Sequence, residues 1–140
     1  MVSPGQIGSG GGPPQLNDLE EPQIMRLLEQ VVALRAGNQL PAAVLVAWSA
    51  LEAAMRRAAM ANSIELRRAD TLEVMRELVS NGILERQRYR DIGEVLRVRN
   101  AIAHGFATPE TVDLRQVLDV IETSSRELLA EGDRPVEPPA

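Results

Sequence analysis

The chain has 140 residues, of which 44% are hydrophobic, and this length supports one modest hydrophobic core and therefore a single domain. It contains no cysteine, which excludes disulfides, thiolate metal sites and cysteine nucleophiles and is typical of a reducing cytoplasm. A formal net charge of -5 disfavours broad, sequence-independent wrapping of a nucleic acid, because such affinity comes from neutralising many phosphates. All 15 basic residues are arginines, so Schiff-base chemistry and a P-loop lysine are excluded as well.

Both ends of the chain have the composition of disordered tails. Residues 1–18 form a Gly/Pro-rich leader and residues 131–140 a short tail, and neither holds enough apolar side chains to offset the entropy lost on ordering. We expect a helical domain over residues 19–130. The N-terminus lacks a signal-peptide pattern, and the longest uncharged run, between Arg35 and Glu52, is too polar to span a bilayer. The sequence therefore predicts a soluble cytoplasmic protein that does not associate with a membrane.

Between the tails, apolar residues recur at the spacing of an α-helix and almost never alternate as they do in a strand. The pattern predicts an all-α fold, a compact bundle of about five helices. Trp48 lies among aliphatic residues and is predicted to fill the core rather than to stack on a base. The expected helices cover about residues 20–36, 41–61, 70–81 and 86–103, and a fifth starts at about residue 108.

Capping residues set the expected starts of two of these helices. Asp70 can cap the third helix, and Glu73 can complete a capping box with it. For the fifth helix, Thr108 followed by Pro109 is typical of an N-cap and a first helical position.

The stretch from Arg99 to Gly105 carries the best candidates for chemistry. It places the only histidine, His104, close to Arg99 and Asn100 at the expected end of the fourth helix. Imidazole can take and give protons near neutral pH, and the planar guanidinium suits a phosphate. These residue types favour phosphodiester chemistry.

Helical geometry constrains how these side chains can cooperate. Arg99 continues the apolar stripe of the fourth helix, so its charge needs a carboxylate, a subunit interface or a bound anion, and Glu52 in the second helix is one candidate partner. Arg99 and His104 lie about 140° apart around an ideal helix. Either the helix ends at His104, or a second copy of the chain completes the cleft.

A simpler interpretation stays open. His104 and Gly105 can merely end a helix, with the glycine in the left-handed conformation. Stacking recognition of RNA is poorly supported, because aromatic residues make up only 2% of the chain. The acidic residues show no metal-ligand spacing, and one histidine makes a transition-metal site improbable, so we expect no metal.

The string from Arg99 to His104 resembles the R-x4-6-H signature of HEPN domains (higher eukaryotes and prokaryotes nucleotide-binding), in which a polar residue, often asparagine, follows the arginine. Residues 47–56 (AWSALEAAMR) also resemble the second helix of bacterial HEPN proteins. The likeness covers residues 20–130. It implies a small helical bundle that forms a homodimer, in which two motifs meet in a shared cleft.

The resemblance also implies an activity, that of a metal-independent endoribonuclease of the toxin-antitoxin or phage-defence type, with no cofactor. His104 would then transfer protons, Arg99 would hold the phosphate and stabilise the transition state, and Asn100 would orient one of them. The implied partners are RNA, a second copy of the chain and a cognate antitoxin protein. The alternative is a non-catalytic HEPN-like module that binds RNA, a nucleotide or a protein.

Phe106 departs from the family pattern. Some HEPN toxins carry a tyrosine two residues after the histidine, where a partner nucleotidyltransferase modifies it. Phenylalanine has no hydroxyl group to modify, so silencing by that route is not expected.

Overall fold

The computed structural model describes residues 18–67, 70–108 and 110–132, and this part of the chain forms five α-helices and no strand. The predicted all-α fold is therefore confirmed. The first 17 residues and residues 133–140, which hold most of the predicted leader and tail, lie outside the described residues. The helices are α1 (Glu21–Ala36), α2 (Leu40–Ala61), α3 (Thr71–Ser80), α4 (Arg86–Ala103) and α5 (Leu114–Gly132).

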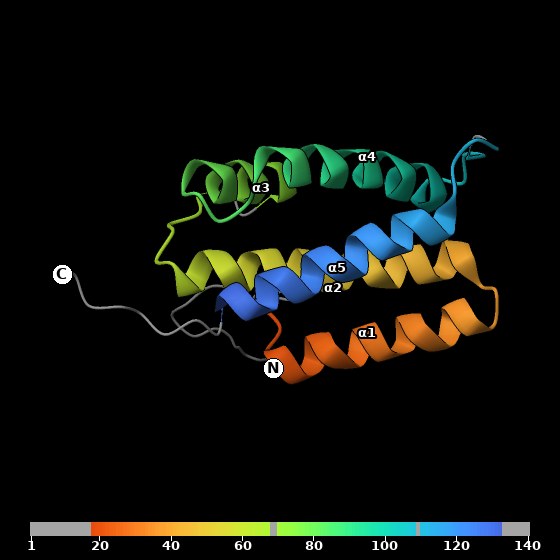
Figure 1. The fold of residues 1–140 in the computed structure, drawn as a ribbon, viewed down its shortest axis with the longest axis horizontal. Coiled ribbons are helices and arrows are strands. Elements are labelled where there is room, and N and C mark those ends of the chain that lie inside the picture. Colours follow the sequence, from red (N-terminus) through yellow and green to blue (C-terminus); the bar gives the residue numbers. More distant parts are fainter. Residues whose placement is uncertain (1–17, 68–69, 109, 133–140) are drawn as a thin grey trace, which may run out of the picture.

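Helix α2 is the centre of the bundle, because it contacts every other helix. In Figure 1 it lies beside α5, with α1 on one side of the pair and α3 and α4 on the other. Its small alanine side chains are buried and allow neighbouring helices to approach closely. Trp48 is 2% exposed, which confirms its predicted place in the core. None of the helices in the described residues is long and apolar enough to cross a membrane.

Helices α1 to α4 end in the same way. Each is followed by one residue with a positive φ, and the next residue donates its backbone N–H to a carbonyl five positions back, which satisfies a carbonyl that the helix leaves free. The positive-φ residues are Asn38, Ser63, Gly82 and Gly105. The closing bonds run from Gln39 to Leu34 (2.8 Å), Ile64 to Ala59 (2.9 Å), Ile83 to Leu78 (2.9 Å) and Phe106 to Ala101 (2.8 Å).

The helix starts confirm one prediction and correct another. The Asp70 carboxylate accepts a hydrogen bond from the Glu73 N–H at 2.8 Å, so Asp70 caps α3 as expected. Helix α5 does not start at Thr108. It starts at Leu114, because the Asp113 carboxylate accepts hydrogen bonds from the N–H groups of the first turn, at 3.0 Å from Arg115 and 3.4 Å from Gln116. A carboxylate is among the strongest N-caps and also interacts favourably with the helix dipole.

Candidate active site at the end of helix α4

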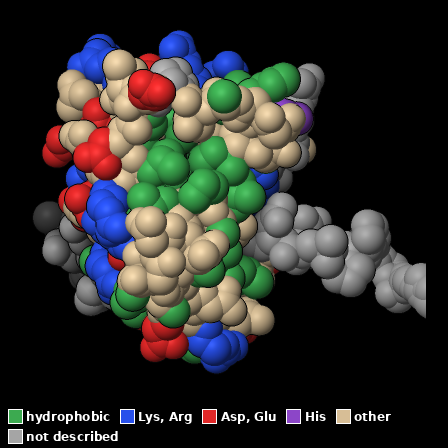
Figure 2. Space-filling model, turned by 90° about the vertical axis from the view of Figure 1, so that its right-hand side faces the viewer, with side chains coloured by type: hydrophobic (Ala, Val, Ile, Leu, Met, Phe, Trp, Pro, Cys, Tyr) green, Lys and Arg blue, Asp and Glu red, His purple; other side chains and the backbone are tan. Residues whose placement is uncertain are grey.

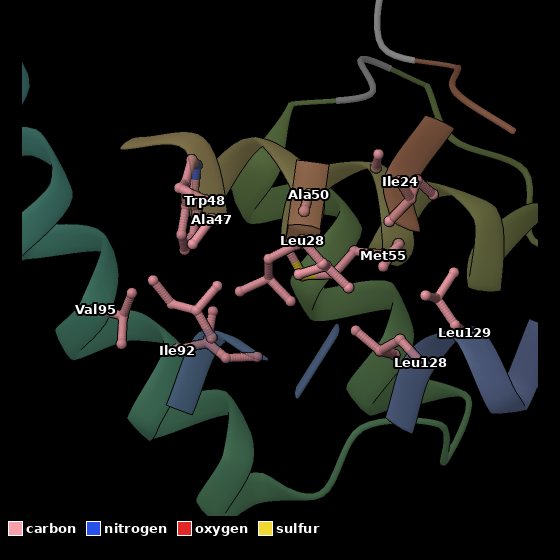
Figure 3. Close-up of a cluster of buried hydrophobic side chains, with 14 of the residues drawn as sticks. Ile24, Leu28, Ala47, Trp48, Ala50, Met55, Ile92, Val95, Leu128 and Leu129 are labelled. Atoms are coloured by element: carbon pink, nitrogen blue, oxygen red, sulfur yellow. The ribbon is translucent and has the colours of Figure 1, made fainter. Parts of the chain in front are cut away.

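Packing against the core positions the last turns of α4. Ile92 is 0% and Val95 3% exposed, and both belong to the buried cluster that also holds Ala47 and Trp48 of α2 (Figure 3). One turn beyond Val95, Arg99 lies on the same stripe and is half-buried, as the helical spacing predicted. The core therefore fixes the direction in which the guanidinium leaves the helix.

The Arg99 guanidinium is held by a neutral group. Its Nη1 donates a hydrogen bond to Oδ1 of Asn100 at 3.0 Å. Its Nε is buried and has no hydrogen-bond partner among the described residues. Such an unsatisfied donor costs about 1–3 kcal/mol, more when the group is charged. The positive charge thus lacks the compensation that an anion would provide.

Other arginines of the same helix have acidic partners. Arg88 lies 3.1 Å from a carboxylate oxygen of Glu127, and Arg97 lies 3.6 Å from one of Glu94. Arg99, by contrast, makes no ion pair within the part of the chain that the structure describes. The difference marks Arg99 as the α4 arginine that is half-buried without a counter-charge.

The predicted pairing of Glu52 with Arg99 is wrong. The Glu52 carboxylate accepts a hydrogen bond from the Thr71 hydroxyl at the start of α3. Helices α2 and α4 run in opposite directions in Figure 1. In Figure 1, α3 lies at the N-terminal end of α4, opposite the end that carries Arg99. Glu52 therefore ties α2 to α3 and lies away from the end of α4.

His104 occupies the C-cap of α4, and its backbone N–H donates to the Asn100 carbonyl at 3.0 Å. The following Gly105 has a φ of +74°, so the helix does end here in the left-handed turn that we considered from the sequence. The His104 side chain is exposed. Its ring centroid lies 6.1 Å from that of Phe106, with the two planes tilted by 39°. The structure thus joins Arg99 to Asn100 but shows no contact of either side chain with the imidazole within one copy.

Figure 2 views the end of the bundle at which α4 terminates. The histidine lies at the rim of this face, next to hydrophobic side chains, and the acidic side chains in this view lie away from it. On the face seen in this view, no acidic side chain lies next to the histidine.

These residues lie in a part of the chain, residues 39–132, that matches the ribonuclease HepT-like family. The match covers about two thirds of the chain. The chain belongs to this family. The HepT-like ribonucleases are a HEPN-superfamily family, so the predicted resemblance to HEPN domains is confirmed. Comparisons with curated proteins and with solved structures gave no match.

The HepT-like match starts at the α1–α2 turn and runs to the end of α5, so it includes the whole α4 end, whereas α1 precedes it. Within the described residues of this HepT-like domain, no group of three or more histidine, aspartate or glutamate side chains is placed to hold a metal ion. Arg99 and His104 instead combine a guanidinium without a counter-charge and an accessible imidazole. These groups can bind a phosphate and transfer a proton.

One feature of this site was not predicted from the sequence. Phe106 entered the sequence argument only as a substitute for a tyrosine, yet its side chain is exposed and lies beside the imidazole. Its position directly after the left-handed Gly105 favoured the opposite outcome, because that position usually holds a side chain that packs back on the helix, so no local signal predicted the exposure.

Proposed function

We propose that this HepT-like chain is an endoribonuclease that cuts RNA without a metal ion in a cleft shared by two copies, and that it acts in a toxin-antitoxin or phage-defence system. The observation that carries the proposal is the half-buried Arg99 guanidinium, which has no carboxylate partner among the described residues and lies near the only histidine. A phosphodiester would supply the missing anion in a geometry that matches the guanidinium fork. Membership of a ribonuclease family supports RNA as the source of that phosphodiester.

The chemistry that fits these groups is transesterification by the ribose 2′-OH. The 2′ oxygen attacks the adjacent phosphorus and loses its proton to a base, while the bond to the 5′ oxygen breaks and that oxygen takes up a proton. The products are a 2′,3′-cyclic phosphate and a 5′-OH end. His104 would transfer the protons, and Arg99 would stabilise the charge that builds up on the phosphate oxygens.

Two observations favour a second copy of the chain in this scheme. In one copy the Arg99 side chain bonds to Asn100, and no contact joins it to the His104 imidazole among the described residues. One imidazole also cannot be the base and the acid of the same step. Two copies that bring their α4 ends together would provide two imidazoles and two guanidiniums around one phosphate. Asn100 would then keep each guanidinium aimed at the cleft.

The direct test is cleavage of mixed single-stranded RNA in the presence of a chelator. We expect the wild type to cut and His104→Ala to lose about 10²- to 10⁴-fold in rate, the range typical of general acid–base catalysis. Arg90→Ala is the matched control, because Arg90 is an exposed arginine of the same helix that contacts Gln87. Equal cleavage by wild type and His104→Ala would contradict the proposal, and so would no cleavage by the wild type.

The products provide an independent check of the chemistry. A polynucleotide kinase should label the new 5′ ends directly, because they carry a hydroxyl group. A single 2′-deoxy substitution at the cut site should abolish cleavage there, since it removes the nucleophile. Fragments with 5′-phosphate ends would show a hydrolytic mechanism instead.

A non-catalytic role is the second candidate, favoured by the formal net charge of -5 and by the lack of any hydrogen bond that orients the His104 imidazole among the described residues. In that case the α4 end would hold RNA, a nucleotide or a protein without turnover. A nucleotide or RNA that copurifies intact with the wild type and is lost in Arg99→Ala would support this role. An antitoxin would be recognised as a protein that binds the chain and suppresses its cleavage.

A further inference from the structure

Three helix ends in this chain provide an internal comparison. Helices α2, α3 and α4 are each followed by a left-handed residue and then by an apolar residue, namely Ile64, Ile83 and Phe106. The two isoleucines are half-buried and pack against the hydrophobic core. Phe106 is 69% exposed, the highest value among the exposed large hydrophobic side chains. The same backbone turn therefore buries two apolar side chains and leaves the third in solvent.

The residues beneath the turns after α3 and α4 also differ. In this motif the apolar side chain usually packs on residues three or four from the helix end. Helix α3 presents the buried Leu78 at that place, so Ile83 has an apolar surface to cover. Helix α4 presents Ala101 and Asn100 at that place, and Phe106 is exposed there. The Phe106 backbone is nevertheless fixed, because its N–H donates to the Ala101 carbonyl at 2.8 Å.

The exposed ring also has a specific neighbour. Its centroid lies 6.1 Å from that of the His104 imidazole. The chain has one phenylalanine, one tyrosine and one tryptophan, of which Trp48 is buried and Tyr89 is half-buried against the core. Phe106 is thus the most exposed of the three, and it lies beside the candidate proton-transfer residue.

We propose that Phe106 forms a stacking subsite for a nucleobase next to the scissile phosphate. The inference rests on the proposed ribonuclease function and adds how the substrate is held. A phosphate bound next to His104 in the proposed shared cleft would carry its flanking base within reach of the ring, and every base has a face that can stack. The subsite increases the affinity for RNA and fixes which nucleotide lies next to the site, with little preference among the bases. Stacking recognition, which the scarcity of aromatic residues disfavoured, is concentrated on this one ring.

The experiment measures binding, so that it does not depend on turnover. The probes are 2′-O-methyl tetra-adenylate, which lacks the nucleophilic hydroxyl, and a tetramer of the same backbone without bases. We expect the wild type to prefer the probe with bases roughly 5- to 150-fold, as expected for the stacking of one base. Phe106→Leu, which keeps an apolar side chain without a π face, should lose most of this preference, and Phe106→Trp should keep it.

A control variant separates stacking from general surface hydrophobicity. Leu72→Ala removes another exposed apolar side chain, 47% exposed on α3, and should leave the preference of the wild type unchanged. An equal preference in wild type and Phe106→Leu would overturn the subsite. No binding of either probe by the wild type would also overturn it. Because Phe106 is exposed, the variants should unfold at the wild-type temperature, which circular dichroism can verify.

Three further outcomes separate this inference from its competitors. If Phe106→Leu lowers the mass of the protein in sedimentation, the ring belongs to a contact between two protein copies and the subsite is wrong. If the wild type shows the ring-dependent preference but cuts no RNA, the subsite stands and the ribonuclease proposal fails. If RNA is cut and Phe106→Leu leaves both KM and the preference unchanged, the ribonuclease proposal stands and the subsite fails.

Discussion

The two ends of helix α4 carry similar residues in different surroundings. At the N-terminal end, Arg88 lies 3.1 Å from Glu127 of α5, and the preceding Leu84 is 5% exposed. At the C-terminal end, Arg99 bonds only to a neutral carboxamide, and the apolar residue that follows the helix, Phe106, is in solvent. At the N-terminal end the arginine has a carboxylate partner and the apolar side chain is buried. At the C-terminal end, among the described residues, the arginine has no carboxylate partner and the apolar side chain is exposed.

This difference identifies charged and apolar groups that are not stabilised by other parts of the fold among the described residues. Charge pairing and apolar burial both stabilise a fold, so a helix end that forgoes both costs stability that a ligand can restore on binding. At the C-terminal end the unused groups are a guanidinium, an imidazole and an aromatic ring, which match the phosphate, the reacting hydroxyl groups and the base of RNA. The predictions below test whether the two ends differ in function as they do in structure.

Among the variants that compare the two ends, the largest effect is expected from Arg99→Ala. Removal of one group that stabilises the transition-state charge should lower the cleavage rate about 10²- to 10³-fold. Stability in urea should stay at the wild-type value or rise, because the variant removes a buried donor that has no partner among the described residues. A large loss of stability with unchanged cleavage would show that Arg99 is a structural residue and would remove the contrast between the ends.

Two glycines test whether the turn after α4 serves the site. Gly82 and Gly105 both have a φ of +74°, and a Cβ at either would meet nothing within 4 Å. Alanine should therefore destabilise both positions by about 1–2 kcal/mol through backbone strain alone. We expect Gly105→Ala to lower cleavage as well, because it displaces His104 and Phe106, whereas Gly82→Ala should cut RNA at the wild-type rate. Equal cleavage by the two variants would mean that the turn geometry is not needed.

Periodicity and capping made much of this fold predictable. The apolar stripes placed five helices, and the half-burial of Arg99 followed from its distance to Ile92 and Val95. These features are local, since each depends on residues within a few turns of one helix. The start of α5 was wrong because two capping signals compete within six residues, and a pattern cannot tell which of them the backbone uses.

Features that depend on two helices were less predictable. Periodicity gives the face on which Glu52 lies but not its level along a neighbouring helix, so its pairing with Arg99 was wrong. The exposure of Phe106 was missed for a related reason, because the same left-handed turn leaves Ile64 and Ile83 half-buried against other parts of the core, so the turn alone does not determine exposure. The roles of Arg99, Asn100 and His104 stay predictions that only activity can test.

A smaller effect is expected at the compensated end. Arg88→Ala removes the ion pair with Glu127, whose side chains are 24% and 59% exposed. Pairs with this much solvent contact typically contribute up to about 1 kcal/mol, so urea unfolding should shift by no more than that. The cleavage rate should be unchanged. A loss of cleavage comparable to that of Arg99→Ala would place Arg88 in the RNA-binding surface and make the two ends alike.

The smallest effect is expected when a carboxylate is introduced next to Arg99 at the C-terminal end of α4. Ala103 is exposed and lies four residues after Arg99, so the carboxylate of Ala103→Glu can reach the guanidinium. An exposed pair of this kind is worth about 0.2–1 kcal/mol, which should raise the KM for RNA roughly 1.4- to fivefold as phosphate competes with the new carboxylate. Ala103→Gln has the same shape without the charge and should keep the wild-type KM. Equal changes in both variants would show that side-chain size, rather than charge compensation, sets binding at this end.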